Sequence, residues 1–131
     1  SNVIELHGTT RRYYCMGCRK KYSLGELEQK GVPKCMQCGG IIKPDVVLYE
    51  EPLNEKDLMN AVIETSGADA LLVIGTSLAV YPAAGLLNYY RGNKLVIINM
   101  SPTPYDSRAS VLIRDKAGKA MSSIISMIKN R

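Results

Sequence analysis

Two pairs of closely spaced cysteines constrain the fold of this chain more than any other feature. The stretch CMGC holds Cys15 and Cys18, and CMQC repeats the same spacing at Cys35 and Cys38. Four thiolates in this pattern converge on one tetrahedral Zn²⁺ and leave no coordination position for water or substrate. We therefore predict one structural zinc ion per chain. Two disulfides would need an oxidising compartment, for which the sequence gives no argument. A redox-active CxxC motif would not need a second CxxC at zinc-site spacing. Both alternatives are therefore weaker than a zinc site.

The region around the cysteines is basic and poor in apolar residues, so we expect zinc to hold it together. Residues 1–43 contain eight Lys or Arg and three Glu, whereas the remainder has nine of each sign. Such a patch favours acidic partners but is more often a solvated surface, and we expect no nucleic-acid partner. No apolar run approaches the ~20 residues of a membrane span, and we expect no signal peptide. We expect a cytoplasmic protein without a membrane partner.

From about residue 53 the pattern changes to alternating helices and strands. NEKDLMNAVIETSG predicts a helix that begins after Asn54 and ends at Gly67, and PAAGLLNYYRG predicts another from Pro82 to Gly92. ALLVIG, LVIIN and SVLI predict strands covered on both faces. KAGKAMSSIISMIKN predicts a last helix. It is expected to turn four apolar side chains inward: Met121, Ile124, Ile125 and Ile128.

This order predicts an α/β fold with a mainly parallel, doubly wound sheet, helices on both faces and a small Cys₄ zinc-ribbon module. Ligands of such sheets bind at the carboxyl ends of the strands. Two predicted strands end in small polar residues there, Gly75-Thr76-Ser77 and Asn99. These groups can bond ribose hydroxyls or phosphate oxygens, although GTS alone also makes an ordinary turn. The chain contains no GxGxxG loop.

Seven stretches taken in order resemble the sirtuins, the NAD-dependent protein lysine deacylases. They are ELHGT, the two CxxC pairs, KPDVVLYEE, GTSLAVYPAA, VIIN and the last helix. The resemblance implies a partial Rossmann-like domain, NAD as cofactor and an acyl-lysine protein or peptide as substrate. It also implies transfer of the acyl group to ADP-ribose with release of nicotinamide. The one histidine, His7, matches the family's general base, and an imidazole suits that role near neutral pH. Without this context, a lone histidine is more often structural.

The resemblance assigns the remaining site residues. The cofactor-binding residues are Gly75, Thr76, Ser77, Asn99, Met100, Ser101 and Ala117. The substrate-binding residues are Val47, Leu48, Tyr49, Val80 and Tyr81, which would pair with the peptide backbone as added strands. For residues 46–48, plain strand core is a compatible alternative. The family usually has Phe-Gly-Glu where this chain has Tyr49, Glu50 and Glu51, and Glu50 restricts the backbone there.

The resemblance also divides the chain. Residues 1–9 form a catalytic-histidine segment, 10–43 the zinc-binding module and 44–131 the C-terminal part of a Rossmann-like NAD-binding domain. The family's Ala-Gly-Ala-Gly segment, Pro-Asp-Phe-Arg loop and Asn-Ile-Asp segment are not among these residues. We therefore expect a deacylase fragment that is inactive by itself and does not bind NAD tightly. One alternative is a non-enzymatic zinc ribbon that binds nucleic acid or an acidic protein. Another is self-association through an unpaired sheet edge.

Overall fold

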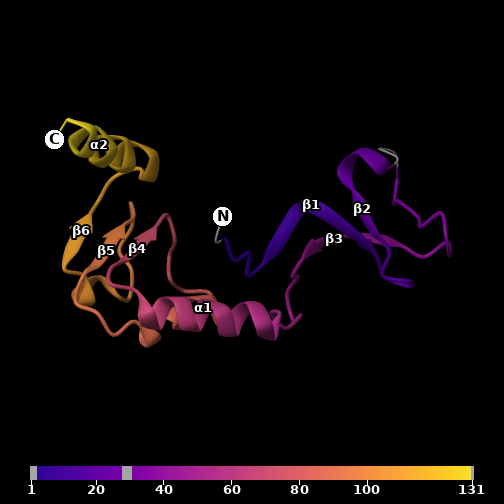
Figure 1. The fold of residues 1–131 in the computed structure, drawn as a ribbon, viewed down its shortest axis with the longest axis horizontal. Helices are drawn as coiled ribbons and strands as arrows, with labels where there is room; N and C mark the ends of the chain where they lie inside the picture. Colours follow the sequence, from indigo (N-terminus) through magenta and orange to yellow (C-terminus); the bar gives the residue numbers. More distant parts are fainter. Residues whose placement is uncertain (1–2, 28–30, 131) are drawn as a thin grey trace. The chain divides into compact units, whose positions relative to one another are not determined.

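The chain folds into two compact units, Ser1–Leu58 and Met59–Arg131 (Figure 1). The computed structural model describes residues 3–27 and 31–130. The first unit holds an antiparallel three-stranded sheet and the four cysteines, and the second holds a parallel three-stranded sheet. The predicted α/β class and the parallel sheet are confirmed. The antiparallel sheet was not predicted.

The sheet of the first unit is built around one long strand. β1 (Gly8–Cys15) lies between β2 (Lys21–Ser23) and β3 (Ile42–Val46), and both pairings are antiparallel. A short 3₁₀ turn, η1 (Leu24–Glu26), follows β2. Among the residues of this unit that the structure describes, four are buried: Cys15, Tyr22, Cys35 and Ile42. Two of these four are cysteines, so the apolar core alone is small, as the sequence indicated.

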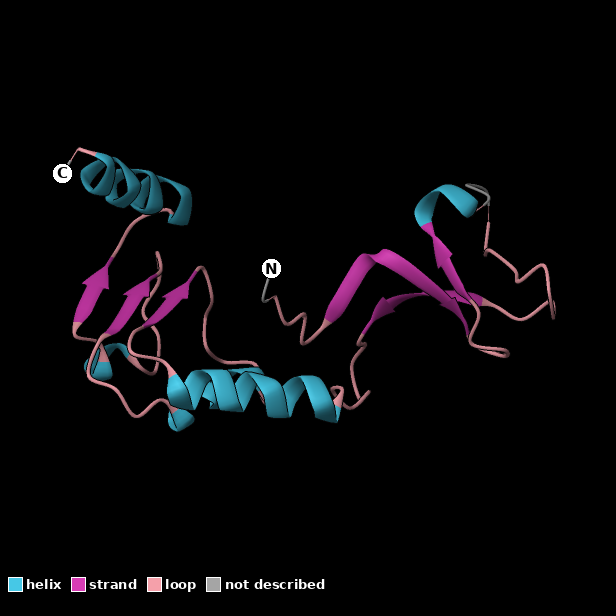
Figure 2. Cartoon of the chain, in the orientation of Figure 1, coloured by secondary structure: helices cyan, strands magenta, loops and turns pink. Residues whose placement is uncertain are grey.

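The second unit contains the three predicted parallel strands. β4 (Leu71–Ile74), β5 (Leu95–Ile98) and β6 (Val111–Ile113) lie in that order, side by side and pointing the same way (Figure 2). Ile97 and Ile98 of the central strand are fully buried. This agrees with the continuous apolar runs that mark parallel strands.

Helices and turns connect these strands. α1 (Glu55–Gly67) begins where predicted, because the Asn54 side chain accepts a hydrogen bond from the amide of Asp57 at 3.1 Å and caps the helix. η2 (Ala83–Tyr89) and η3 (Asp106–Arg108) are 3₁₀ helices, and α2 (Ala117–Lys129) follows β6. Among the described residues, no helix is long and apolar enough to cross a membrane.

Two predictions about the helices were wrong in detail. The segment predicted as a helix from Pro82 to Gly92 is the 3₁₀ helix η2, and Gly85 in its middle disfavours a regular α-helix. In α2, Met121 and Ile124 are half-buried, but Ile125 and Ile128 are 47% and 67% exposed. Only the part of α2 around the buried Ala120 is well covered. The apolar residues nearer the C-terminal end of the helix are exposed.

Candidate functional site

The four cysteines converge as their spacing predicted. All four Sγ atoms lie within 4.8 Å of one another. The Sγ atoms of Cys15 and Cys38 are 3.4 Å apart, and those of Cys18 and Cys35 are 3.5 Å apart. Sulfurs bound to tetrahedral zinc at ~2.3 Å would be separated by about 3.8 Å, so the cluster fits this ion. A fully thiolate set is also the chemistry of a structural zinc site.

Hydrogen bonds to two of the sulfurs, those of Cys15 and Cys35, favour their thiolate forms. The amides of Gly17 and Cys18 donate to Cys15 Sγ at 3.3 and 3.5 Å. The bond from the Cys18 amide is the largest cause of the lowered pKa of Cys15. The Tyr22 hydroxyl donates to Cys35 Sγ at 3.0 Å and lowers the pKa of Cys35 to about 6. The same bond raises the pKa of Tyr22 to about 12. Sequence reasoning missed Tyr22, because no spacing rule marks a hydrogen-bond donor to a metal ligand.

His7 is an exposed residue in the turn that leads into β1. Its carbonyl accepts a hydrogen bond from the Val47 amide at 3.1 Å, so backbone contacts hold the turn on the end of β3. Gly8 has a φ of 74° and pairs with Val46, and a Cβ there would collide with the carbonyl oxygen of Asp45. Glycine is thus required beside the histidine. The role of His7 as general base stays a prediction.

The segment matched to the substrate strand, Val47–Tyr49, directly follows β3. Val47 is half-buried, whereas Tyr49 is fully exposed. The Glu51 carboxylate anchors this loop: it accepts the Leu48 amide at 2.9 Å and pairs with Lys43 at 2.6 Å. The hydrogen bond from the Leu48 amide is the largest cause of the lowered pKa of Glu51. Residues 47–49 therefore lie in a loop fixed at its base, and their pairing with a substrate stays a prediction.

Glu50 stands in the left-handed backbone region that favours glycine, with a φ of 69°. This gives a physical basis to the predicted restriction at this position. We expect Glu50→Gly to raise the free energy of unfolding by about 0.5–1 kcal/mol, since the relief of strain exceeds the added chain entropy. Denaturant unfolding measures the change. Glu50→Ala is the control, because it removes the charge but keeps the Cβ. A glycine variant no more stable than the alanine variant would contradict the prediction.

Six of the seven residues matched to the NAD site directly follow the ends of β4 and β5. The Gly75 amide donates to the Ile98 carbonyl at 2.9 Å, and the Asn99 amide donates to the Ile113 carbonyl at 3.1 Å. The first bond brings the two predicted polar loops together at one edge of the sheet, and the second joins the loop after β5 to the end of β6. Gly75 has a φ of 64°, and no atom lies within 4 Å of where its Cβ would be. Thr76 and Ser77 are exposed. The edge is therefore open and polar, as a ribose or phosphate requires.

A network that sequence reasoning missed shapes the loop after β5. The Asn99 side chain donates to the Ser101 carbonyl at 2.9 Å, and Arg114 donates to the same oxygen at 2.7 Å. Arg114 also forms an ion pair with Asp106, and Asp106 accepts a bond from the Thr103 hydroxyl at 2.7 Å. A signal existed in the sequence, because Arg114 directly follows β6 and so lies at the same carboxyl edge.

Four further residues of the predicted cofactor and substrate sites lie in the second unit. Met100 is exposed, and Ala117 is half-buried at the first residue of α2. Val80 and Tyr81 are exposed, and the Tyr81 hydroxyl lies 3.1 Å from that of Tyr105. Leu78, which sequence reasoning also missed, is buried with a φ of 54°. Such a conformation is strained for a bulky residue and is found preferentially at functional loops.

Comparisons with known proteins show which family has this fold. The model of the Sir2 family matches residues 1–82, and the chain belongs to this family, the sirtuins. The chain is 55% identical to an NAD-dependent protein deacetylase of Clostridium tetani over 126 residues, which are 95% of this chain and 51% of that protein. A deacetylase of Staphylococcus aureus is 42% identical over 124 residues, again 95% of this chain and 51% of the relative. The chain thus spans about half the length of these curated relatives.

Solved structures agree with this assignment. A Sir2 structure described as a complex with a p53 peptide and NAD⁺ superposes with a TM-score of 0.92 at 34% identity, covering 100% of this chain and 57% of the other. A structure described as Sir2 bound to acetylated peptide gives a TM-score of 0.90 at 34% identity, covering 97% of this chain and 56% of the other. The predicted family membership is confirmed.

Proposed function

We propose that this chain forms part of an NAD-dependent protein lysine deacylase and supplies its general base, its structural zinc site and one side of its NAD site. The observation that carries the proposal is the polar edge at Gly75 and Asn99, in a chain of the Sir2 family that also fixes the His7–Gly8 turn. A non-enzymatic zinc ribbon accounts for the four cysteines only. It gives no reason for the glycine required beside His7 or for the open polar edge.

The second unit would be the C-terminal part of a Rossmann-like domain and would hold NAD. Thr76 and Ser77 would donate to phosphate or ribose oxygens, and the open space over Gly75 would allow close approach of the ligand. Asn99, Met100 and Ser101 would contact the adenosine ribose, with Arg114 holding their loop in shape. Ala117 would lie beside the adenine. When bound, NAD supplies a ribose carbon that gives up nicotinamide and accepts the acyl oxygen.

The substrate would be an acyl-lysine in an extended peptide. Residues 47–49 and 80–81 would pair with its backbone, which gives affinity with little dependence on sequence. The imidazole of His7 would accept a proton from a ribose hydroxyl, and its exposure leaves both ring nitrogens accessible. Residues 1–9, 10–43 and 44–131 would then supply the base, the zinc module and the nucleotide-binding part.

We further propose that turnover needs more than these 131 residues, because the relatives are about twice as long. β4 pairs with β5 on one side only within the described sheet, and Leu72 and Ile74 are exposed on it. Another strand can therefore add at this edge, from the rest of such a protein or from a second copy of the chain. Light scattering on the purified chain distinguishes a monomer from a self-associated form.

Calorimetric titration with NAD tests the proposed site. We expect no micromolar binding to the chain alone. Micromolar binding is expected for a chimaera in which this chain replaces the matching segment of the Clostridium tetani relative. In the chimaera, Ser77→Ala should weaken binding about tenfold, since one hydrogen bond to a charged group is lost. Ser126→Ala on the exposed face of α2 is the matched control. Tight binding by the isolated chain, or equal effects of the two variants, would contradict the assignment.

A further inference from the structure

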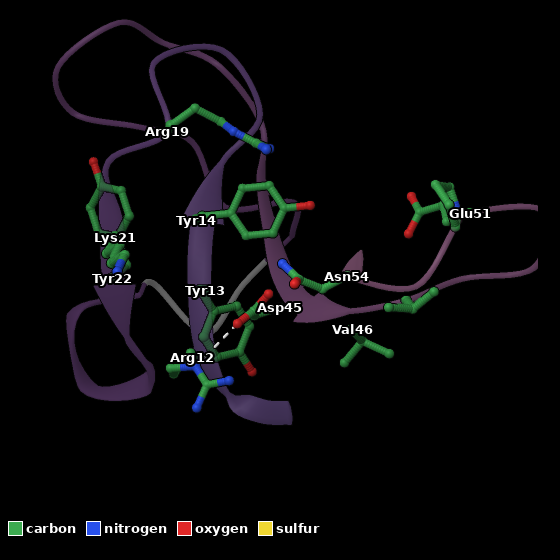
Figure 3. A pocket seen from close by; sticks show the side chains of 12 residues that line it. Arg12, Tyr13, Tyr14, Arg19, Lys21, Tyr22, Asp45, Val46, Glu51 and Asn54 are labelled. Carbon is green, nitrogen blue, oxygen red and sulfur yellow. Dashed lines mark hydrogen bonds and ion pairs between the residues drawn. The ribbon is translucent and has the colours of Figure 1, made fainter. Parts of the chain in front are cut away.

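A pocket of about 480 Å³ in the first unit has no role in the function proposed above (Figure 3). Its walls come from β1, β2, the end of β3 and the loop that leads to Asn54. Three tyrosines and three basic residues line it, together with two acids and two valines. The basic residues are Arg12, Arg19 and Lys21, and the acids are Asp45 and Glu51.

Both acids are already paired within the first unit. Asp45 accepts a bond from Arg12 Nε at 3.1 Å, and Glu51 pairs with Lys43 at 2.6 Å. By contrast, Arg19 and Lys21 form no ion pair with any residue in the ranges 3–27 and 31–130. Two cations that no described acid neutralises therefore line a pocket whose own acids are already paired. The ligand that such a pocket favours is an anion.

The position of Arg19 is fixed before any ligand arrives. Its guanidinium carbon lies 4.9 Å from the centre of the Tyr14 ring, and Figure 3 shows the side chain extending toward that ring. Its backbone has a φ of 62°, and its amide donates to the Cys15 carbonyl at 3.0 Å, so the cysteine turn holds it in place. A guanidinium fixed in this way presents a planar fork of donors that matches a carboxylate.

We propose that this pocket binds an aspartate or glutamate side chain of the protein substrate, near the acyl-lysine. The inference rests on the proposed function, because the pocket includes Val47, the first residue of the proposed substrate strand. A peptide paired with residues 47–49 would pass the mouth of the pocket within a few residues. A polyphosphate backbone fits less well, because Asp45 and Glu51 would repel its repeated charges. The preferred substrates would thus carry acidic residues next to the modified lysine.

Anisotropy titration of the zinc-loaded chain with four dye-labelled peptides of equal length tests this inference. The peptides combine acetylated or free lysine with flanking Glu or flanking Gln. We expect both Glu peptides to bind about fivefold more tightly than their Gln counterparts, as two exposed ion pairs allow. The preference should be lost in the double variant Arg19→Gln/Lys21→Gln. Arg11→Gln/Lys34→Gln is the matched control, because it removes two exposed cations of the same unit that do not line the pocket.

The outcomes separate the pocket from the proposed function. A Glu preference that persists in the control and vanishes in the pocket variant supports the inference whether or not acetylation matters. Ring-proton shifts of Tyr14 on binding the Glu peptides would support it further. Equal binding of Glu and Gln peptides, or equal loss in both double variants, would overturn it. Binding that depends on acetylation but not on Glu would support the proposed function and overturn the pocket inference.

Discussion

Cys15→Ser is expected to remove zinc from the chain and to unfold the antiparallel sheet of the first unit. Cys15 and Cys35 are two of the four buried residues in the described part of that unit, so the cysteine cluster and the core share half of these side chains. Metal binding is worth about 10–16 kcal/mol in structural zinc sites, against the 5–15 kcal/mol that stabilises a whole domain. A unit with so few other buried residues has nothing to replace that contribution.

Elemental analysis of zinc and amide hydrogen exchange of residues 8–15 measure this effect. We expect about one zinc per chain in the wild type, little zinc in the variant and loss of exchange protection in β1. Met16→Ser is the matched control, because Met16 is an exposed residue of the same cysteine turn and is expected to keep both zinc and protection. A Cys15→Ser chain that stays folded in this unit without zinc would contradict the assignment.

The same centre should lose zinc in acid. Thiolates are the zinc ligands, and the hydrogen bond from Tyr22 lowers the pKa of Cys35 to about 6. In the zinc-free cluster this thiol is therefore largely a thiolate at neutral pH and takes up a proton as the pH falls through about 6, so that protons compete with zinc for it. Because its pKa is lowered in the folded unit, the stability it contributes is present above its ordinary pKa and lost on that descent. Extraction of zinc by a chelator should accordingly become easier below pH 6.

His7→Ala is expected to lower the turnover of the chimaera about 10²–10⁴-fold while zinc content and folding stay unchanged. The substitution keeps the carbonyl that accepts the Val47 amide, and the side chain of His7 is exposed and makes no hydrogen bond with a described residue. The lost activity would therefore report chemistry, not structure. Nicotinamide release measures it, and Thr10→Ala, at an exposed position of β1, is the control. Turnover that survives in His7→Ala would remove the histidine from the mechanism.

Local signals in the sequence were enough for part of the fold. The runs ALLVIG, LVIIN and SVLI predicted β4, β5 and β6, because strands of a parallel sheet need apolar residues on both faces. Asn54 predicted the start of α1 through its capping bond. The cysteine spacing predicted the metal centre, since two CxxC turns suffice to place four sulfurs.

The features that were missed depend on contacts between distant residues. β1 reads GTTRRYYC, which has no alternation of apolar and polar residues, because the buried side of its sheet is completed by cysteines. The exposure of Ile125 and Ile128 depends on what covers α2, which periodicity cannot reveal. The bond from Tyr22 to Cys35 joins residues 13 positions apart. The bonds of Arg114 reach residues up to 15 positions away in the sequence. Family resemblance assigned residues after β4 and β5 to a predicted NAD site, but only the hydrogen bond from Gly75 to Ile98 shows that the two loops lie together.

The most direct test of the proposed function is turnover by the zinc-loaded chimaera. An acetyl-lysine peptide and NAD are supplied together and separately, and mass spectrometry follows both substrates. We predict that the peptide loses its acetyl group only when NAD is present, with one nicotinamide released per lysine and the acetyl group recovered on ADP-ribose. A folded chimaera that binds zinc and NAD but leaves the acetyl-lysine intact would contradict it.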